Sequence, residues 1–265
     1  MTEPDGEPER RTPRDRRLFL SAAVMLGLAW WAWPRVAPLF VGPFDFEEID
    51  NPSGFRRIAG GEITGLPSFL FGLDARDAAD LTAEVQAARS DLCQVLFGGT
   101  LDPNVVPIAY FSDYNCPYCR VLTERLANVE AQSAGGVQIA WHEWPVFGPT
   151  SVLSARAALA ADMQGAYIAF HKHLMRSRFV PTERYLANIA QDLGADPERL
   201  LADMNSPDVS SRLRNTEAVA QIFGFAGTPS LVVGRTVVIG SVSEATLTAL
   251  VEQERRDGPP PACSA

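Results

Sequence analysis

Residues 105–120 read Val-Val-Pro-Ile-Ala-Tyr-Phe-Ser-Asp-Tyr-Asn-Cys-Pro-Tyr-Cys-Arg, and the rest of the chain is organised around them. The first half is a short apolar run rich in β-branched and aromatic residues, which predicts a strand that ends at Ser112 and Asp113. Cys116 and Cys119 follow at a spacing that places both sulfurs on one turn of a helix. A strand that leads into two cysteines at a helix start predicts a redox site.

The predicted helix start favours a reactive thiolate at Cys116. Unpaired backbone N–H groups and the positive end of the helix dipole at that position stabilise thiolate over thiol. Pro117 fits the first helical position, because the N–H that proline lacks would have no partner there. The motif therefore predicts a cysteine of low pKa with a second cysteine one turn further along.

Composition indicates a packed globular domain and excludes one class of partner. The chain has 265 residues, of which 46% are hydrophobic and 21% charged, proportions typical of a folded core. Its formal net charge is −9 and Lys172 is its only lysine, so we expect no nucleic-acid partner, because phosphate contacts need clustered Lys and Arg. His171 and His173 flank this lysine two positions apart, which points them to different faces of a helix and predicts a solvated surface rather than a metal site.

The N-terminus predicts the compartment. Five arginines over 10–17 precede an uncharged apolar run over 18–33, the order of an export signal or a signal anchor whose basic side stays in the cytoplasm. Residues 1–17 are predicted to be a disordered cytoplasmic tail. As a helix the apolar run spans roughly 24 Å, short of a hydrocarbon core of about 30 Å, so its length leaves both alternatives open.

Two features of the apolar run favour the anchor. Trp30, Trp31 and Trp33 cluster where an outer interfacial belt would lie, and no small-x-small cleavage site follows them. We therefore expect residues 18–41 to be a membrane anchor or uncleaved signal that holds the protein at the inner membrane, with its body in the bacterial periplasm. The alternative is a soluble periplasmic protein after signal cleavage.

Residues 42–101 are predicted to be a linker followed by an amphipathic helix. Mixed composition with Gly60, Gly61 and several prolines predicts an irregular linker with a short hairpin. Apolar residues recur at spacings of three or four over 74–97, which predicts a single helix that a glycine pair ends.

Residues 102–256 alternate strand and helix and are predicted to be one α/β domain. After the strand over 105–111, a helix is predicted from Cys116 to about Gln132, and a second strand begins at Val137. A β-α-β unit of this length requires parallel strands with a right-handed crossover.

The second half of this domain begins with a mainly helical block over about 150–223. Two β-branched runs, 230–233 and 236–239, then predict a β-hairpin around a Gly-Arg turn. Ser243 caps a last helix, and residues 257–265 are predicted to be an irregular tail.

This order of elements, with Thr228 and Pro229 just before the hairpin, resembles the thioredoxin fold. The helical block resembles the insertion of the DsbA-like branch of exported thiol:disulfide oxidoreductases. The resemblance covers about Asp102–Glu254, and its landmarks are Cys116-Pro117-Tyr118-Cys119 and the Thr228–Pro229 pair. The predicted fold class is therefore α/β, a thioredoxin-like fold with an inserted helical subdomain, preceded by an N-terminal membrane helix.

The resemblance implies a substrate-binding loop beside the cysteines. It implies a cis peptide bond between Thr228 and Pro229, and backbone pairing around Thr228 with an extended substrate chain. The implied partners are cysteine-containing envelope proteins and a membrane redox partner. Many relatives carry a buried acid six residues before the first cysteine, whereas this chain has Tyr110; Asp113 and Glu143 are the candidates to replace that proton acceptor.

The resemblance also implies the roles of the cysteines. Cys116 is expected to be the exposed attacking sulfur and Cys119 the shielded resolving sulfur, and changes around Pro117 and Tyr118 are expected to tune the redox potential. A dithiol oxidase is the favoured activity. The alternatives are an isomerase or reductase kept reduced by a membrane donor, which threonine before the cis proline resembles, and a non-catalytic chaperone or binding module.

The remaining cysteines bear on two further predictions. A closed zinc site needs four ligands, and Cys93 and Cys263 are isolated, so we expect neither a metal nor a cofactor. Cys93 and Cys263 are interpreted as a structural disulfide that ties the N-terminal helix to the tail. Two unpaired thiols, or an intermolecular link through Cys263, are the alternatives.

Overall fold

The computed structural model describes residues 24–29, 36, 41–64, 81–99, 102–260 and 263. The chain divides into two compact units, 1–42 and 43–265. The predicted tail over 1–17 and most of the predicted membrane helix over 18–41 lie outside the described residues; within them, 24–29 are helical. Among the residues that the structure describes, no helix has both the length and the apolar character needed to cross a membrane.

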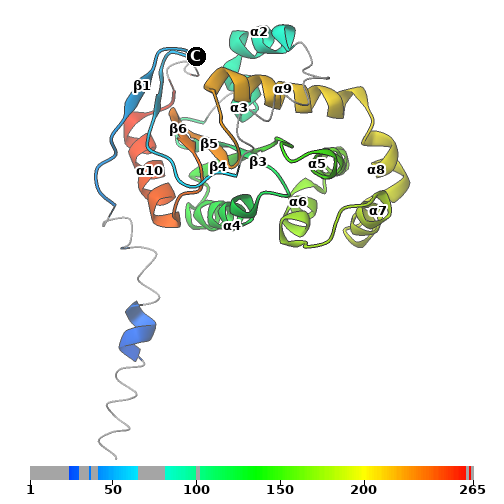
Figure 1. The fold of residues 1–265 in the computed structure, drawn as a ribbon. Helices are drawn as coiled ribbons and strands as arrows, with labels where there is room; N and C mark the ends of the chain where they lie inside the picture. The colour runs from blue at the N-terminus through cyan, green and yellow to red at the C-terminus, as the bar shows by residue number, and fades with distance from the viewer. Residues whose placement is uncertain are drawn as a thin grey trace, which may run out of the picture. The chain divides into compact units, whose positions relative to one another are not determined.

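A six-stranded sheet in the order β1-β2-β6-β5-β3-β4 lies at the centre of the second unit (Figure 1). Its strands are β1 (Glu47–Ile49), β2 (Phe55–Arg57), β3 (Val106–Ser112), β4 (Val137–Glu143), β5 (Ser230–Val233) and β6 (Thr236–Ile239). β3 and β4 are parallel, whereas β5 is antiparallel to both β3 and β6. The predicted β-α-β unit and the predicted hairpin are therefore both confirmed.

Helices cover both faces of this sheet. The helices that the structure describes in the second unit are α2 (Thr82–Ser90), α3 (Leu92–Phe97), α4 (Pro117–Gln132), α5 (Pro149–Asp162), α6 (Tyr167–Arg176), α7 (Glu183–Asp192), α8 (Pro197–Asp203), α9 (Pro207–Phe223) and α10 (Glu244–Asp257), and four of them cover the sheet. α4 and α10 pack on one face, and α3 and α9 on the other (Figure 1). Every residue of β3 is consequently buried, as expected for a central strand covered on both sides.

The predicted helical block over 150–223 has two roles in the structure. Its helices α5 to α8 form a separate apolar cluster that also encloses Cys116 and Cys119. Its last helix, α9, instead covers the sheet and carries α2 on its outer side (Figure 1). The cysteine motif thus lies where the inserted helices meet the thioredoxin-like sheet.

The region before the domain differs from its prediction in two ways. The single helix predicted over 74–97 is wrong in its described part, because α2 and α3 are separated at Asp91, whose carboxylate caps α3 by accepting from the Gln94 N–H. The predicted hairpin is present as β1 and β2, but β2 also joins the main sheet by parallel pairing with β6.

A buried arginine explains why β2 joins the sheet. Arg56 is only 7% exposed, and its guanidinium contacts Glu254 at 2.5 Å and Asp257 at 2.6 Å. Its Nε also donates to Thr236 Oγ1 at 2.8 Å. These charge-assisted bonds from α10 and β6 fix the segment that leads toward the cysteines.

Candidate active site

Cys116 caps the helix that carries the cysteine motif. It precedes α4 in an extended conformation, with φ −82° and ψ 116°, and Pro117 is the first helical residue. The backbone N–H of Cys119 donates to Cys116 Sγ at 3.2 Å, so the sulfur occupies the place of an N-cap oxygen. Pro117 is exposed and Tyr118 is partly exposed. The prediction that Cys116 opens the helix is confirmed.

The two thiols differ in pKa although one helical turn separates them. Hydrogen bonding with the Cys119 side chain is the largest influence on the pKa of Cys116, and together with the Thr228 and Thr64 side chains it lowers this pKa to about 6 against the opposing effect of burial. Burial raises the pKa of Cys119 well above its usual value, and the hydrogen bond with Cys116 adds to the rise. At neutral pH the pair therefore holds a thiolate at Cys116 and a proton at Cys119.

Cys116 is buried, and the prediction of an exposed attacking sulfur is wrong for this conformation. Both Cys116 and Cys119 are 0% exposed. Cys116 Sγ lies 3.5 Å from the Thr228 carbonyl oxygen and 3.6 Å from Thr64 Oγ1. Thr64 belongs to the predicted linker, so a segment distant in sequence covers the sulfur.

The loop at Thr228 and Pro229 lies beside Cys116. The peptide bond between these two residues is cis, and Thr228 is fully buried. Both backbone groups of Thr228 hydrogen-bond to Thr64: its carbonyl accepts at 2.8 Å and its N–H donates at 3.1 Å. The Pro229 carbonyl accepts from the Gly240 N–H at 2.8 Å, which ties the loop to the end of β6.

Tyr110 replaces the acid that many relatives carry. Its side chain is fully buried, and its hydroxyl donates to the backbone carbonyl of Cys119 at 3.0 Å. Burial, followed by the nearby Cys119 sulfur, raises the pKa of Tyr110 well above its usual value. The phenol therefore keeps its proton and orients the helix turn at Cys119 without acting as a proton acceptor.

Neither acidic candidate from the sequence replaces that acceptor in the described residues. The Asp113 carboxylate is buried, which raises its pKa, and it is used to hold the loop after β4. It accepts from the N–H groups of Asn115, Val146 and Phe147 and from the Ser151 hydroxyl. Glu143 is buried too, and its hydrogen bonds go to other groups.

A buried polar cluster surrounds Glu143, and the sequence reasoning missed it. Glu143 Oε1 accepts from the Tyr114 and Tyr167 hydroxyls, each at 2.6 Å, and lies 3.3 Å from His171 Nδ1. His171 is 1% exposed, so its predicted solvated position is wrong. These residues come from β4, α6 and the loop before Cys116, and only Tyr167 and His171, four positions apart on α6, are linked by sequence spacing. Their bonds tie the inserted helices to the cysteine-bearing loop.

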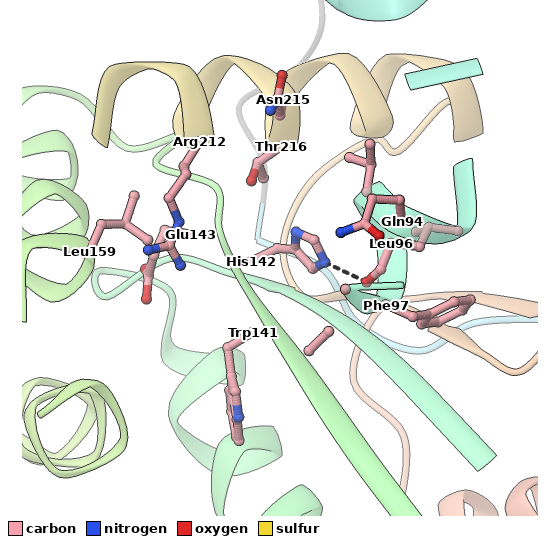
Figure 2. Close-up of a pocket in the computed structure, with 13 residues that line it drawn as sticks. Gln94, Leu96, Phe97, Trp141, His142, Glu143, Leu159, Arg212, Asn215 and Thr216 are labelled. Carbon is pink, nitrogen blue, oxygen red and sulfur yellow. Dashed lines mark hydrogen bonds between the residues drawn. The ribbon is translucent and has the colours of Figure 1, made fainter. Parts of the chain in front are cut away.

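The polar end of β4 also faces a cavity that does not contain the cysteines. The cavity has a volume of about 460 Å³ and lies between α3, β4 and α9. Figure 2 shows the hydrogen bond that His142 Nε2 donates to the Leu96 carbonyl oxygen, with Arg212 and Glu143 on the other side of the cavity. Burial lowers the pKa of His142 to about 4, so this ring is neutral and donates the bond.

A thioredoxin-like sheet, an inserted helical subdomain and a Cys-x-x-Cys helix start beside a cis-proline loop together define a thiol:disulfide oxidoreductase. The family described as the DSBA-like thioredoxin domain matches residues 107–252, more than half of the chain. The chain belongs to this family and is an enzyme of the thiol:disulfide oxidoreductase class.

Two solved structures illustrate the similarity. A thioredoxin-like oxidoreductase from Silicibacter pomeroyi DSS-3 is 37% identical, with a TM-score of 0.56, over 62% of this chain and 97% of that one. A periplasmic thioredoxin-like protein from Salmonella enterica serovar Typhimurium is 28% identical, with a TM-score of 0.54, over 63% of this chain and 97% of that one. Both comparisons agree with the thioredoxin-like fold and its helical insertion.

A curated relative shares only part of its length with this chain. The Na(+)/H(+) antiporter NhaA of Herminiimonas arsenicoxydans is 28% identical over 158 residues, which are 60% of this chain and 25% of that protein. The chain thus spans about a quarter of the curated relative that it matches.

Proposed function

We propose that this protein is a dithiol oxidase of the cell envelope. The observation that carries the proposal is the asymmetry of the cysteine pair, with the pKa of Cys116 lowered to about 6 and that of Cys119 raised. A stable Cys116 thiolate favours the reduced form of the enzyme, which makes its disulfide a stronger oxidant. For this two-electron couple, each tenfold bias corresponds to about 30 mV.

The reaction assigns one role to each sulfur. A substrate thiolate attacks Cys116 Sγ in the enzyme disulfide, a substrate–Cys116 bond forms, and Cys119 leaves and takes up a proton. The second substrate thiolate then attacks the substrate sulfur of this mixed disulfide and displaces Cys116 as a thiolate. The substrate loses two electrons, the enzyme gains them, and a membrane redox partner re-oxidises the Cys116–Cys119 pair.

The proposed substrates are cysteine-containing envelope proteins. The periplasmic relative from Salmonella supports an envelope location, and the arginine-flanked apolar run supports anchoring at the inner membrane through residues 18–41. Backbone pairing at Thr228 next to Pro229 would accept an extended chain of almost any sequence, because main-chain bonds carry no side-chain preference.

A disulfide isomerase or reductase is the second candidate. Threonine before the cis proline, Thr228 in this chain, favours it through the resemblance to the isomerase branch. Such an enzyme would use the same Cys116 thiolate, but a membrane donor would keep the pair reduced.

The redox state of the pair in living cells distinguishes the two candidates. Rapid acid quenching followed by alkylation with a mass-tagged maleimide reads how many thiols are free. A disulfide between Cys116 and Cys119 is the expected result for the oxidase, and a dithiol would support the isomerase or reductase. A Cys116→Ser variant that still oxidises a reduced dithiol peptide at the wild-type rate would overturn both.

A further inference from the structure

A short segment after β2 runs along the sheet to the cysteines; we call residues 60–64 the strap. Upstream of it, the Ile58 N–H donates to the Val237 carbonyl at 3.2 Å and so prolongs the pairing with β6. Within it, the Glu62 carbonyl accepts from the Ser241 N–H at 2.9 Å. The strap ends at Thr64, beside the cis-proline loop.

Thr64 pairs with Thr228 as one strand residue pairs with another. The bridge between them is antiparallel, and its two hydrogen bonds, of 2.8 Å and 3.1 Å, use the N–H and the carbonyl of Thr228. These are the backbone groups that the proposed function assigns to the substrate chain. The Thr64 side chain also lies over the attacking sulfur, with Oγ1 3.6 Å from Cys116 Sγ.

The backbone of the strap packs directly against the backbone at the end of β6 and just after it. A Cβ atom built on Gly60 would overlap the carbonyl oxygen of Ile239, and one built on Gly61 would overlap that of Ser241. Only glycine allows backbone to approach backbone at this distance. Hydrogen bonding with the Glu62 carboxylate raises the pKa of Tyr118, so the strap also reaches one of the two residues between the cysteines.

We propose that the strap is an intramolecular occupant of the substrate site, which a substrate chain must displace before it pairs with Thr228 and reaches Cys116. This inference rests on the proposed function. A tethered segment acts at a high effective concentration, in the millimolar range for short flexible tethers. Extended, unfolded polypeptides that offer several backbone hydrogen bonds compete with it, whereas short thiols that offer none do not. The strap thus selects unfolded chains as the substrate class and shields the Cys116 thiolate between reactions.

A substitution at the tight approach tests the proposal without altering Cys116 or Thr228. In the full-length protein, Gly61→Val forces the strap away from Ser241, and the oxidised variant is expected to oxidise a reduced, unstructured two-cysteine peptide about tenfold faster, because the open fraction of molecules rises. Gly42→Ala is the matched control, because its added Cβ meets no atom within 4 Å. An unchanged rate in Gly61→Val, with the free energy of unfolding also unchanged, would overturn the strap's role.

A second measurement does not depend on how Gly61→Val folds. In the Cys119→Ser protein, Cys116 is first converted to its mixed disulfide with thionitrobenzoate. The thiolate of a single-cysteine version of the same peptide then attacks Cys116 Sγ and displaces thionitrobenzoate, and amide hydrogen exchange in the product is compared with the free protein. The Thr64 N–H is expected to lose protection while the Thr228 N–H keeps it, now bonded to the peptide. Retained protection at Thr64 would overturn the strap's role but leave the proposed function intact. If the peptide forms no mixed disulfide with Cys116 in this variant, the proposed function fails and the strap's role fails with it.

Discussion

Cys116 and Cys119 are equally buried, yet their surroundings act on their thiols in opposite directions. Around Cys116, the Cys119 N–H donates to the sulfur and the Thr64 hydroxyl lies within hydrogen-bond distance of it, and the Thr228 side chain also lowers the pKa. Around Cys119, burial is the largest influence and raises the pKa. Exposure cannot explain the difference, because both residues are 0% exposed. Hydrogen bonding to the charged form of Cys116 and the stronger effect of burial on Cys119 together separate the two pKa values.

The pH dependence of alkylation tests this contrast most strongly. In the reduced protein at pH 7, Cys116 is expected to react with iodoacetamide at least about a hundredfold faster than Cys119, since the thiolate is the nucleophile. The Cys116 rate should rise with a midpoint near pH 6. Mass spectrometry of the labelled peptides gives both rates, and similar rates at the two sites would contradict the contrast.

The same pKa shift affects stability in a definite direction. The folded-state pKa of Cys116 lies near 6, below the value of 9.0 expected without these contacts. Its ionisation therefore stabilises the reduced fold in full above about pH 9, and this contribution is lost as the pH falls through about 6. Denaturant unfolding of the reduced protein and of Cys116→Ala across this range measures the difference.

Removing the Cys119 side chain should raise the pKa of Cys116, because this side chain is the largest influence that lowers it. Cys119→Ala deletes the largest influence that lowers the pKa of Cys116. The alkylation midpoint should therefore rise by about one pH unit, which means that the Cys116 thiolate binds its proton roughly tenfold more tightly. Cys119→Ser keeps a hydrogen-bond donor and is the matched control with a smaller rise. Equal midpoints in the wild type and Cys119→Ala would show that the backbone N–H alone is sufficient.

Thr64 should have a smaller effect. Thr64→Val replaces the hydroxyl with a methyl of similar size, and the pKa of Cys116 should rise by a few tenths of a unit because a weaker influence is lost. Thr64→Ser retains the hydroxyl and should leave the alkylation midpoint close to that of the wild type. A fall in the midpoint of Thr64→Val would contradict this role.

The Cys93–Cys263 disulfide should leave the contrast unchanged. It joins α3 to residue 263 across 170 positions, with the Cα atoms 5.4 Å apart. The double variant Cys93→Ser/Cys263→Ser should lose up to about 5 kcal/mol of unfolding free energy in the chain-entropy account, while the Cys116 alkylation midpoint stays near pH 6. A shifted midpoint would mean that the disulfide positions the active site.

Local patterns predicted the parts of the site that are contiguous in sequence. The strand β3, the Cys116 cap and Pro117 at the first helical position follow one another along the chain, so their chemistry is readable from spacing. The parallel pairing of β3 with β4 also followed, because short β-α-β connections allow one arrangement.

The non-local parts could not be predicted in this way. Thr64 meets Thr228 and Cys116 only because β2 is carried to the sheet edge by the buried ion pairs of Arg56. His171 looked solvated beside Lys172, but its partner Glu143 lies on a strand 28 positions earlier. A single sequence carries no signal for contacts between residues that lie far apart along the chain, since each contact depends on how separate elements pack.

The nested order of the four cysteines constrains how the molecule is made. Cys116 and Cys119 lie inside the loop that the Cys93–Cys263 bond closes. In a chain delivered N-terminus first, Cys93 arrives together with two reactive thiols and long before its own partner. The Cys93–Cys263 bond can form only after the whole catalytic domain has emerged. Until then, maturation of this disulfide-exchanging protein requires that Cys93 does not pair with Cys116 or Cys119.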